Sequence, residues 1–216
     1  MNKTDLKLYA ITDRQWLHGA RLSEHVKLAI EGGATMIQIR DKDILSKDSD
    51  AGLKDEYNEA LEIKRICHEH KVPLIINDNV QFAIDIDADG VHLGQDDMNP
   101  AEARKLLGTD KIIGVTAKTV EQAKKAQADG ADYLGSGAVF GSTTKLNAKP
   151  MTKELLSEIT AAVDIPVVAI GGINADNAST LKGTGIAGIA VVGAIFASAD
   201  IKAAARELAE ICDNML

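Results

Sequence analysis

Aromatic residues are scarce in this sequence, and the charge balance is acidic. Phe, Trp and Tyr together make up 3% of the 216 residues, which leaves few rings on which nucleic-acid bases could stack. The formal net charge of -8 also opposes contact with a phosphate backbone, so nucleic acid is not an expected partner. An anionic ligand would need a locally cationic pocket, because the overall charge repels it.

Cysteines and long apolar runs are also few. Cys67 and Cys212 lie far apart and match no disulfide framework and no metal or redox motif, which fits a reducing cytoplasm. The first residues reach charged side chains too soon for a signal peptide. No stretch approaches the roughly 18 apolar residues of a membrane span. We therefore expect a cytoplasmic protein without a membrane partner.

Short β-like segments alternate with amphipathic helical patterns. Helix starts are marked by capping residues, such as Asn99 before Pro100 and Thr119. Strands that alternate with helices indicate a parallel sheet, and eight such units favour an α/β fold with one (β/α)₈ TIM-barrel domain over residues 1–216. An open doubly wound sheet is the alternative. The eight expected strands are residues 8–12, 36–40, 73–77, 90–94, 112–116, 133–137, 166–171 and 189–193.

Polar residues and glycines gather where the expected strands end, which is where (β/α)₈ barrels carry their active sites. The second strand is unusual, because its polar residues alternate on one face while Ile37 and Ile39 occupy the other. The whole set consists of Gln38, Arg40, Lys42, Asn77, Asp78, Gln95, Asp96, Asp97, Thr116, Lys145, Gly171, Gly172 and Gly193.

These residue types suit phosphate chemistry. Arg40, Lys42 and Lys145 could surround phosphate groups, and Asp78 and Asp97 could bind the same ligand through a hard cation. Mg²⁺ is commonly held by one or two carboxylates together with substrate phosphates and water. The glycine-containing loops after the seventh and eighth strands would leave backbone N–H groups open to a second phosphate. The pattern predicts two anion sites, one of them with Mg²⁺.

Each feature also has a structural interpretation. Asp78 could cap the next helix with Gln81 as its capping-box partner. Asp96 and Asp97 could be ordinary loop residues, the polar face of the second strand could be solvated, and the paired glycines could form a turn.

Three further groups are interpreted as structural. The Cys67-His68-Glu69-His70 run is not expected to bind a metal, because residues two apart on a helix do not face one another. Tyr9, Trp16 and His92 are interpreted as packing residues. The segment "GSTTK" contains no GK[ST] and is not a P-loop.

Several segments, in their order and spacing, resemble the thiamine-phosphate synthase family. They are QIRDK (38–42), ND (77–78), ADGVHLGQDDM (88–98), GVTAKTVEQ (114–122), GADYLGSGAVFGSTTK (130–145) and AIGGI (169–173). The resemblance implies a transferase that joins 4-amino-2-methyl-5-(diphosphooxymethyl)pyrimidine to a thiazole phosphate and releases diphosphate. It also implies a dissociative mechanism, in which a pyrimidine methyl cation forms before the thiazole nitrogen attacks.

The resemblance assigns roles to individual residues. Arg40, Lys42 and Lys145 would act catalytically on the leaving diphosphate, and Asp78 and Asp97 would hold Mg²⁺. Lys145 would reach the site when loop 138–150 closes. The pyrimidine diphosphate would be bound by Gln38, Ile39, Arg40, Asp41, Lys42, Asn77, Thr116 and Lys145, and the thiazole phosphate by Ser142, Thr143, Thr144, Gly172, Val192 and Gly193.

The sequence departs from the family pattern at a few positions. Thr116 stands where serine is usual and Ser142 where threonine is usual, Ala138 replaces a common proline, Lys118 a frequent histidine and Gly193 a frequent serine. The changes at Lys118 and Gly193 could weaken binding of the second substrate. A thiazole tautomerase-like isomerase and a non-catalytic thiamine-phosphate binder are the alternatives. The oligomeric state stays open, a homo-oligomer included.

Overall fold

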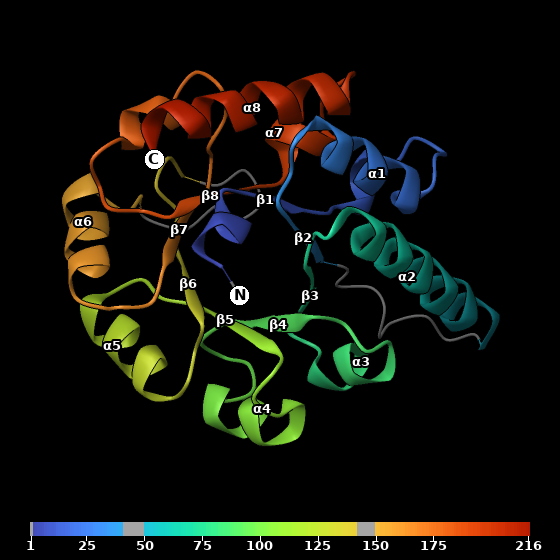
Figure 1. The fold of residues 1–216 in the computed structure, drawn as a ribbon, viewed down its shortest axis with the longest axis horizontal. Coiled ribbons are helices and arrows are strands. Elements are labelled where there is room, and N and C mark those ends of the chain that lie inside the picture. The colour runs from blue at the N-terminus through green and yellow to red at the C-terminus, as the bar shows by residue number, and fades with distance from the viewer. Residues whose placement is uncertain (1, 41–49, 142–149) are drawn as a thin grey trace.

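The computed structural model describes residues 2–40, 50–141 and 150–216, without the side chains of residues 50–53. The strands are parallel and close into a barrel in the order β1 to β8, with helices around the outside (Figure 1). The expected TIM barrel is therefore confirmed, and the open doubly wound sheet is excluded because β1 pairs with β8.

Each expected strand is present, with ends displaced by at most two residues. The strands are β1 (Leu8–Ile11), β2 (Met36–Ile39), β3 (Leu74–Asn77), β4 (Gly90–Leu93), β5 (Ile112–Thr116), β6 (Tyr133–Gly137), β7 (Val167–Ile170) and β8 (Gly188–Val191). The helices are α1 (Leu22–Gly32), α2 (Asp50–His70), α3 (Val80–Asp85), α4 (Pro100–Leu107), α5 (Val120–Ala128), α6 (Lys153–Ala161), α7 (Gly193–Phe196) and α8 (Ile201–Met215), with 3₁₀ turns η1 (Lys3–Leu6), η2 (Arg14–Trp16) and η3 (Ala178–Leu181).

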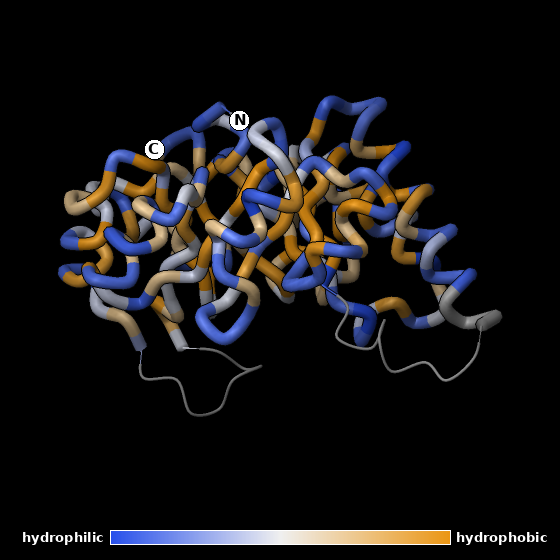
Figure 2. The backbone as a smooth tube through the Cα atoms, turned by 90° about the horizontal axis from the view of Figure 1, so that it is seen from below, coloured by the Kyte–Doolittle hydropathy of each residue, from blue (hydrophilic) through white to orange (hydrophobic). Residues whose placement is uncertain are grey.

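The strands separate two buried layers. Ile37 and Ile39 point outward into the core between strands and helices, as expected. Met36 belongs to the inner cluster that fills the barrel, and Gln38, on the same face, is only 2% exposed. The polar face of β2 is therefore not a solvated strand surface. Figure 2 shows hydrophobic residues concentrated through the body of the barrel, whereas the turns at its two ends are mostly hydrophilic.

Capping residues begin the helices as the sequence predicts. Asn99 accepts a hydrogen bond from the Ala101 amide at 2.9 Å, with Pro100 at the first position of α4. Thr119 accepts one from the Gln122 amide at 3.2 Å at the start of α5. Among the described residues, no helix has the length and apolar character needed to cross a bilayer.

Candidate active site

The predicted site residues fall into two groups. Those in the described part of the chain lie in the last residues of β2, β3 and β5 or shortly after β2, β3, β4, β7 and β8, and therefore share one end of the barrel. The predictions for Asp41, Lys42, Ser142, Thr143, Thr144 and Lys145 concern positions outside the described residues.

Two carboxylates meet at the ends of β3 and β4, which pair in parallel. The side chains of Asp78 and Asp97 lie within hydrogen-bonding reach of each other. Asp78 is also held by the Asn77 amide, whose Nδ2 donates to Asp78 Oδ2 at 2.6 Å, and the Gly94 N–H donates to Asp97 Oδ2 at 2.6 Å. The two residues predicted to bind a cation are thus adjacent in space.

Asp78 is not the cap of α3. That role belongs to Asn79, whose Oδ1 accepts a hydrogen bond from the Phe82 amide at 2.9 Å. Asp78 itself has a left-handed backbone with φ of 61°, which turns the chain between β3 and the cap. The capping interpretation of Asp78 is therefore wrong, and its carboxylate is free of the helix.

The charges around Asp78 favour a bound cation. Partial burial, first, and then the neighbouring Asp97 carboxyl raise the pKa of Asp78 to about 6, while the Asn77 amide and the Arg40 charge oppose that rise. A divalent cation would relieve the repulsion between the carboxylates. Two carboxylates suit a metal that takes its other ligands from substrate and water, as Mg²⁺ does. The described residues hold no group of three or more His, Cys, Asp or Glu side chains with metal-binding geometry.

Arg40 directly follows β2 and lies near Asp78. Its backbone N–H donates to Thr12 Oγ1 at 3.1 Å, and the Thr12 N–H donates to the Gln38 carbonyl at 2.9 Å. The two bonds hold the end of β2 against β1. The guanidinium is close enough to Asp78 to lower the pKa of that carboxyl, so one predicted phosphate ligand lies near the two carboxylates.

A chain of hydrogen bonds crosses the barrel interior between two predicted ligands of the pyrimidine diphosphate. Gln38 Nε2 donates to Tyr9 Oη at 2.6 Å, and Tyr9 Oη lies 2.9 Å from Tyr133 Oη. Tyr133 Oη lies 3.0 Å from His92 Nδ1, and His92 Nε2 lies 3.0 Å from Thr116 Oγ1. We call Gln38, Tyr9, Tyr133, His92 and Thr116 the core hydrogen-bond chain.

Sequence reasoning missed the polar role of this chain. The sequence indicates packing roles for Tyr9 and His92 and gives no role to Tyr133, although each occupies an inward-facing strand position. A polar side chain at an inward-facing strand position predicts a buried hydrogen bond, because a buried polar atom needs a partner. Burial lowers the pKa of His92 to about 4 and raises the pKa of both tyrosines, so at neutral pH all three rings are uncharged.

The glycines after β7 allow two loops to touch. Gly171 and Gly172 have φ of 101° and 67°, and a Cβ on Gly171 would lie 2.4 Å from that of Ala138. The Val139 and Phe140 amides donate to the Ile170 and Gly171 carbonyls, each at 3.0 Å. The pair is more than a solvent-exposed turn, because it fixes the segment that leads toward residues 142–149.

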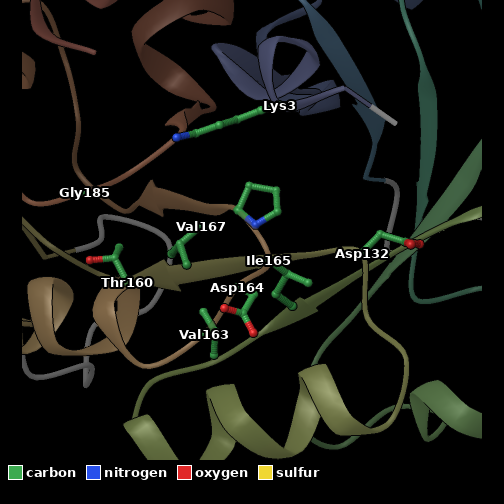
Figure 3. Close-up of a pocket in the computed structure, with 9 residues that line it drawn as sticks. Lys3, Asp132, Thr160, Val163, Asp164, Ile165, Val167 and Gly185 are labelled. Carbon is green, nitrogen blue, oxygen red and sulfur yellow. The ribbon is translucent and has the colours of Figure 1, made fainter.

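A separate pocket lies at the other end of the barrel. It has a volume of about 430 Å³ and is lined by residues at the starts of β6 and β7 and by Lys3, Thr160 and Gly185 (Figure 3). Asp132 in its wall is already engaged, since Arg104 Nη2 donates to it at 2.7 Å. The amino-terminal end of a TIM barrel usually serves stability, and none of the predicted site residues lines this pocket.

Comparison with known families matches residues 8–195 to the family described as thiamine monophosphate synthase. The chain belongs to this family. The resemblance seen in QIRDK, GVHLGQDDM and the neighbouring segments is thus confirmed for most of the chain.

Relatives in the thiamine monophosphate synthase family match nearly the full length. A thiamine-phosphate synthase from Ruminiclostridium cellulolyticum is 48% identical over 213 residues, covering 99% of this chain and 98% of the relative. One from Clostridium tetani is 47% identical over 204 residues, covering 94% of both. The solved structure of a thiamine phosphate pyrophosphorylase from Pyrococcus furiosus has a TM-score of 0.88 and 38% identity, covering 99% of this chain and 98% of that one. None of the three supports the tautomerase alternative.

Proposed function

We propose that this chain catalyses the thiamine-phosphate synthase reaction, in which 4-amino-2-methyl-5-(diphosphooxymethyl)pyrimidine and a thiazole phosphate give thiamine phosphate and diphosphate. Family membership supports the reaction class. The observation that carries the assignment to a site is the contact between Asp78 and Asp97 beside Arg40. A tautomerase would need no paired carboxylates for a diphosphate-bound metal.

The chemistry requires stabilisation of a leaving group. When the bond between the pyrimidine methyl carbon and the diphosphate oxygen breaks, negative charge accumulates on the diphosphate. Arg40 would lie against that charge, and family resemblance adds Lys42 and Lys145, which lie outside the described residues. Mg²⁺ held by Asp78 and Asp97 would supply Lewis-acid neutralisation of the same charge.

The remaining residues would bind and orient the two substrates. Thr116 and Asn77 present a hydroxyl and an amide at the ends of β5 and β3. Asn77 also holds the Asp78 carboxylate, so it would link the metal to the substrate. Gln38 Nε2 already donates one hydrogen to Tyr9, which leaves its second amide hydrogen and Oε1 for the ligand.

The thiazole phosphate would bind on the opposite side of the barrel mouth. Gly172 follows β7, and Val192 and Gly193 follow β8 at the start of α7. These positions correspond to a common phosphate site of TIM barrels. By resemblance, Ser142, Thr143 and Thr144, which lie outside the described residues, would complete the site.

The direct test is condensation of the two substrates with Mg²⁺ by the wild type and by Asp78→Ala. We expect kcat/KM to fall at least about a hundredfold, equivalent to about 2.7 kcal/mol of barrier. Asp96→Ala is the matched control, because it removes a neighbouring exposed carboxylate that has no assigned role, and it should retain activity. Full activity of Asp78→Ala would refute the metal assignment.

A further inference from the structure

The core hydrogen-bond chain has a defined direction. An amide nitrogen can only donate, so Tyr9 Oη is the acceptor in its bond with Gln38 Nε2. The single hydroxyl hydrogen of Tyr9 is then available for the next oxygen, that of Tyr133, at 2.9 Å. The Tyr133 hydroxyl hydrogen is then left for His92 Nδ1, which lies 3.0 Å away.

The same direction continues through the imidazole. A neutral histidine with an accepting Nδ1 carries its proton on Nε2. In that tautomer the Nε2–H would donate to Thr116 Oγ1, which lies 3.0 Å away. Because Thr116 Oγ1 accepts on the His92 side, its own hydrogen is turned away from His92. The reverse direction would place two donors on Tyr9 Oη and leave the Tyr9 hydrogen without an acceptor in the chain.

Two strand positions beside the core hydrogen-bond chain, Gly114 and Gly135, carry no side chain. A Cβ on Gly114 would lie 2.1 Å from Tyr133 Cζ and 2.3 Å from its hydroxyl oxygen. A Cβ on Gly135 would lie 3.0 Å from His92 Cε1. Apolar side chains would fill a barrel interior without the desolvation cost of buried polar groups. Glycine at both positions instead leaves room for the Tyr133 and His92 rings in the orientations that join the chain.

We infer that Tyr133 and His92 are positioning residues that hold the Thr116 hydroxyl as a hydrogen-bond donor to an oxygen of the substrate diphosphate. The inference rests on the proposed function, because it needs the diphosphate at the carboxyl end of β5. A hydroxyl that can rotate would present either its hydrogen or a lone pair to the anion, and only the hydrogen is favourable. A donor oriented before the substrate arrives incurs no reorganisation cost during the reaction.

Tyr133→Phe tests the inference, because it keeps the ring and removes only the link between Tyr9 and His92. We expect kcat/KM for the pyrimidine diphosphate to fall about tenfold, the range for a lost oriented hydrogen bond. Thr116→Val should cause a similar loss, whereas Thr116→Ser, which keeps the hydroxyl, should retain most of the wild-type activity. Tyr57→Phe is the matched control: the Tyr57 hydroxyl donates to the Asp85 carbonyl at 3.1 Å, outside the site.

The double variant separates positioning from general packing. If Tyr133 acts through Thr116, adding Tyr133→Phe to Thr116→Val should cause little further loss of kcat/KM. Losses that multiply, or a Tyr133→Phe enzyme as active as the wild type, would overturn the inference. A wild type that performs no condensation would instead overturn the proposed function.

Nitrogen-15 NMR of the histidine side chains provides an independent readout that does not depend on activity. In the wild type, His92 should be the tautomer protonated on Nε2. In Tyr133→Phe, where the donor to Nδ1 is lost, the fraction of that tautomer should decrease. A wild-type His92 protonated on Nδ1 would show that the chain runs the other way and would contradict the inference.

Discussion

The carboxyl groups of Asp78 and Asp97 lie against each other at the ends of two neighbouring strands, where like charges repel. The burial and the neighbouring carboxylate that raise the pKa of Asp78 to about 6 make the fully ionised pair unfavourable without a counter-ion. This arrangement has measurable consequences for stability and for metal binding.

In the metal-free protein, the contribution of Asp78 to stability should fall as the pH rises from about 4 to about 6, whereas that of His92, whose pKa is lowered to about 4, should rise over the same window. The pKa of Asp78 is raised from 3.8 to about 6 in the folded chain, so in this window its carboxyl binds more protons in the folded state than in the unfolded state. Its contribution to stability falls with pH under that condition. The difference in pH dependence between the wild type and Asp78→Asn, measured by thermal unfolding in the presence of a chelator, isolates the Asp78 contribution, and saturating Mg²⁺ should abolish it.

Asp97→Asn provides the control for that pH dependence. Without the second carboxylate, the pKa of Asp78 should return toward its ordinary value, and this part of the pH dependence should shrink. If the variant and the wild type show the same dependence on pH and Mg²⁺, the two carboxylates do not act as a pair.

Gly171→Ala should destabilise the protein more than Gly183→Ala. Both glycines have a left-handed backbone, with φ of 101° and 85°, so alanine costs about 1–2 kcal/mol at each. At Gly171 the new Cβ would also lie 2.5 Å from Ala138 Cα, whereas at Gly183 it would meet no atom within 4 Å. We expect at least about 2 kcal/mol of additional destabilisation at Gly171, measured by denaturant unfolding. Equal losses would contradict the tight contact between the two loops.

Gly193→Ser tests the thiazole phosphate site. A Cβ at this position would lie 3.9 Å from Ala197 Cβ, an ordinary contact, so the variant should fold with little change in Tm. The added hydroxyl should supply a phosphate donor and lower KM for the thiazole phosphate several-fold, by about 1 kcal/mol. Ala203→Ser adds the same group at an exposed position on α8, away from Gly193, and should leave KM unchanged. An unchanged KM in Gly193→Ser would argue against the assignment of Gly193.

Local sequence patterns predicted the architecture because they follow from neighbouring residues. Alternation in MIQIR places Ile37 and Ile39 on one face of β2 and Gln38 on the other, and the structure confirms both placements. The capping residues Asn99 and Thr119 mark helix starts because they bond to amides two or three residues away.

Local sequence patterns predict only part of the candidate site. Asp78 has two plausible local roles, and the sequence alone does not choose between them. In the structure Asn79 caps α3, and Asp78 lies beside a carboxylate that comes from the next strand. Pairing of β3 with β4 brings those two residues together, which no pattern within either segment specifies.

The sequence by itself determined the succession of strands and helices, the face of each strand that meets the helices, and the family motifs at the strand ends. Those properties depend on periodicity, which is local. Only the tertiary structure joined Tyr9 to Tyr133, residues 124 positions apart, and joined Tyr133 to His92. Barrel closure and strand register decide which inward-facing side chains meet. The space left by Gly114 and Gly135, on the adjacent strands β5 and β6, then allows the rings of Tyr133 and His92 to lie where their polar atoms can form hydrogen bonds.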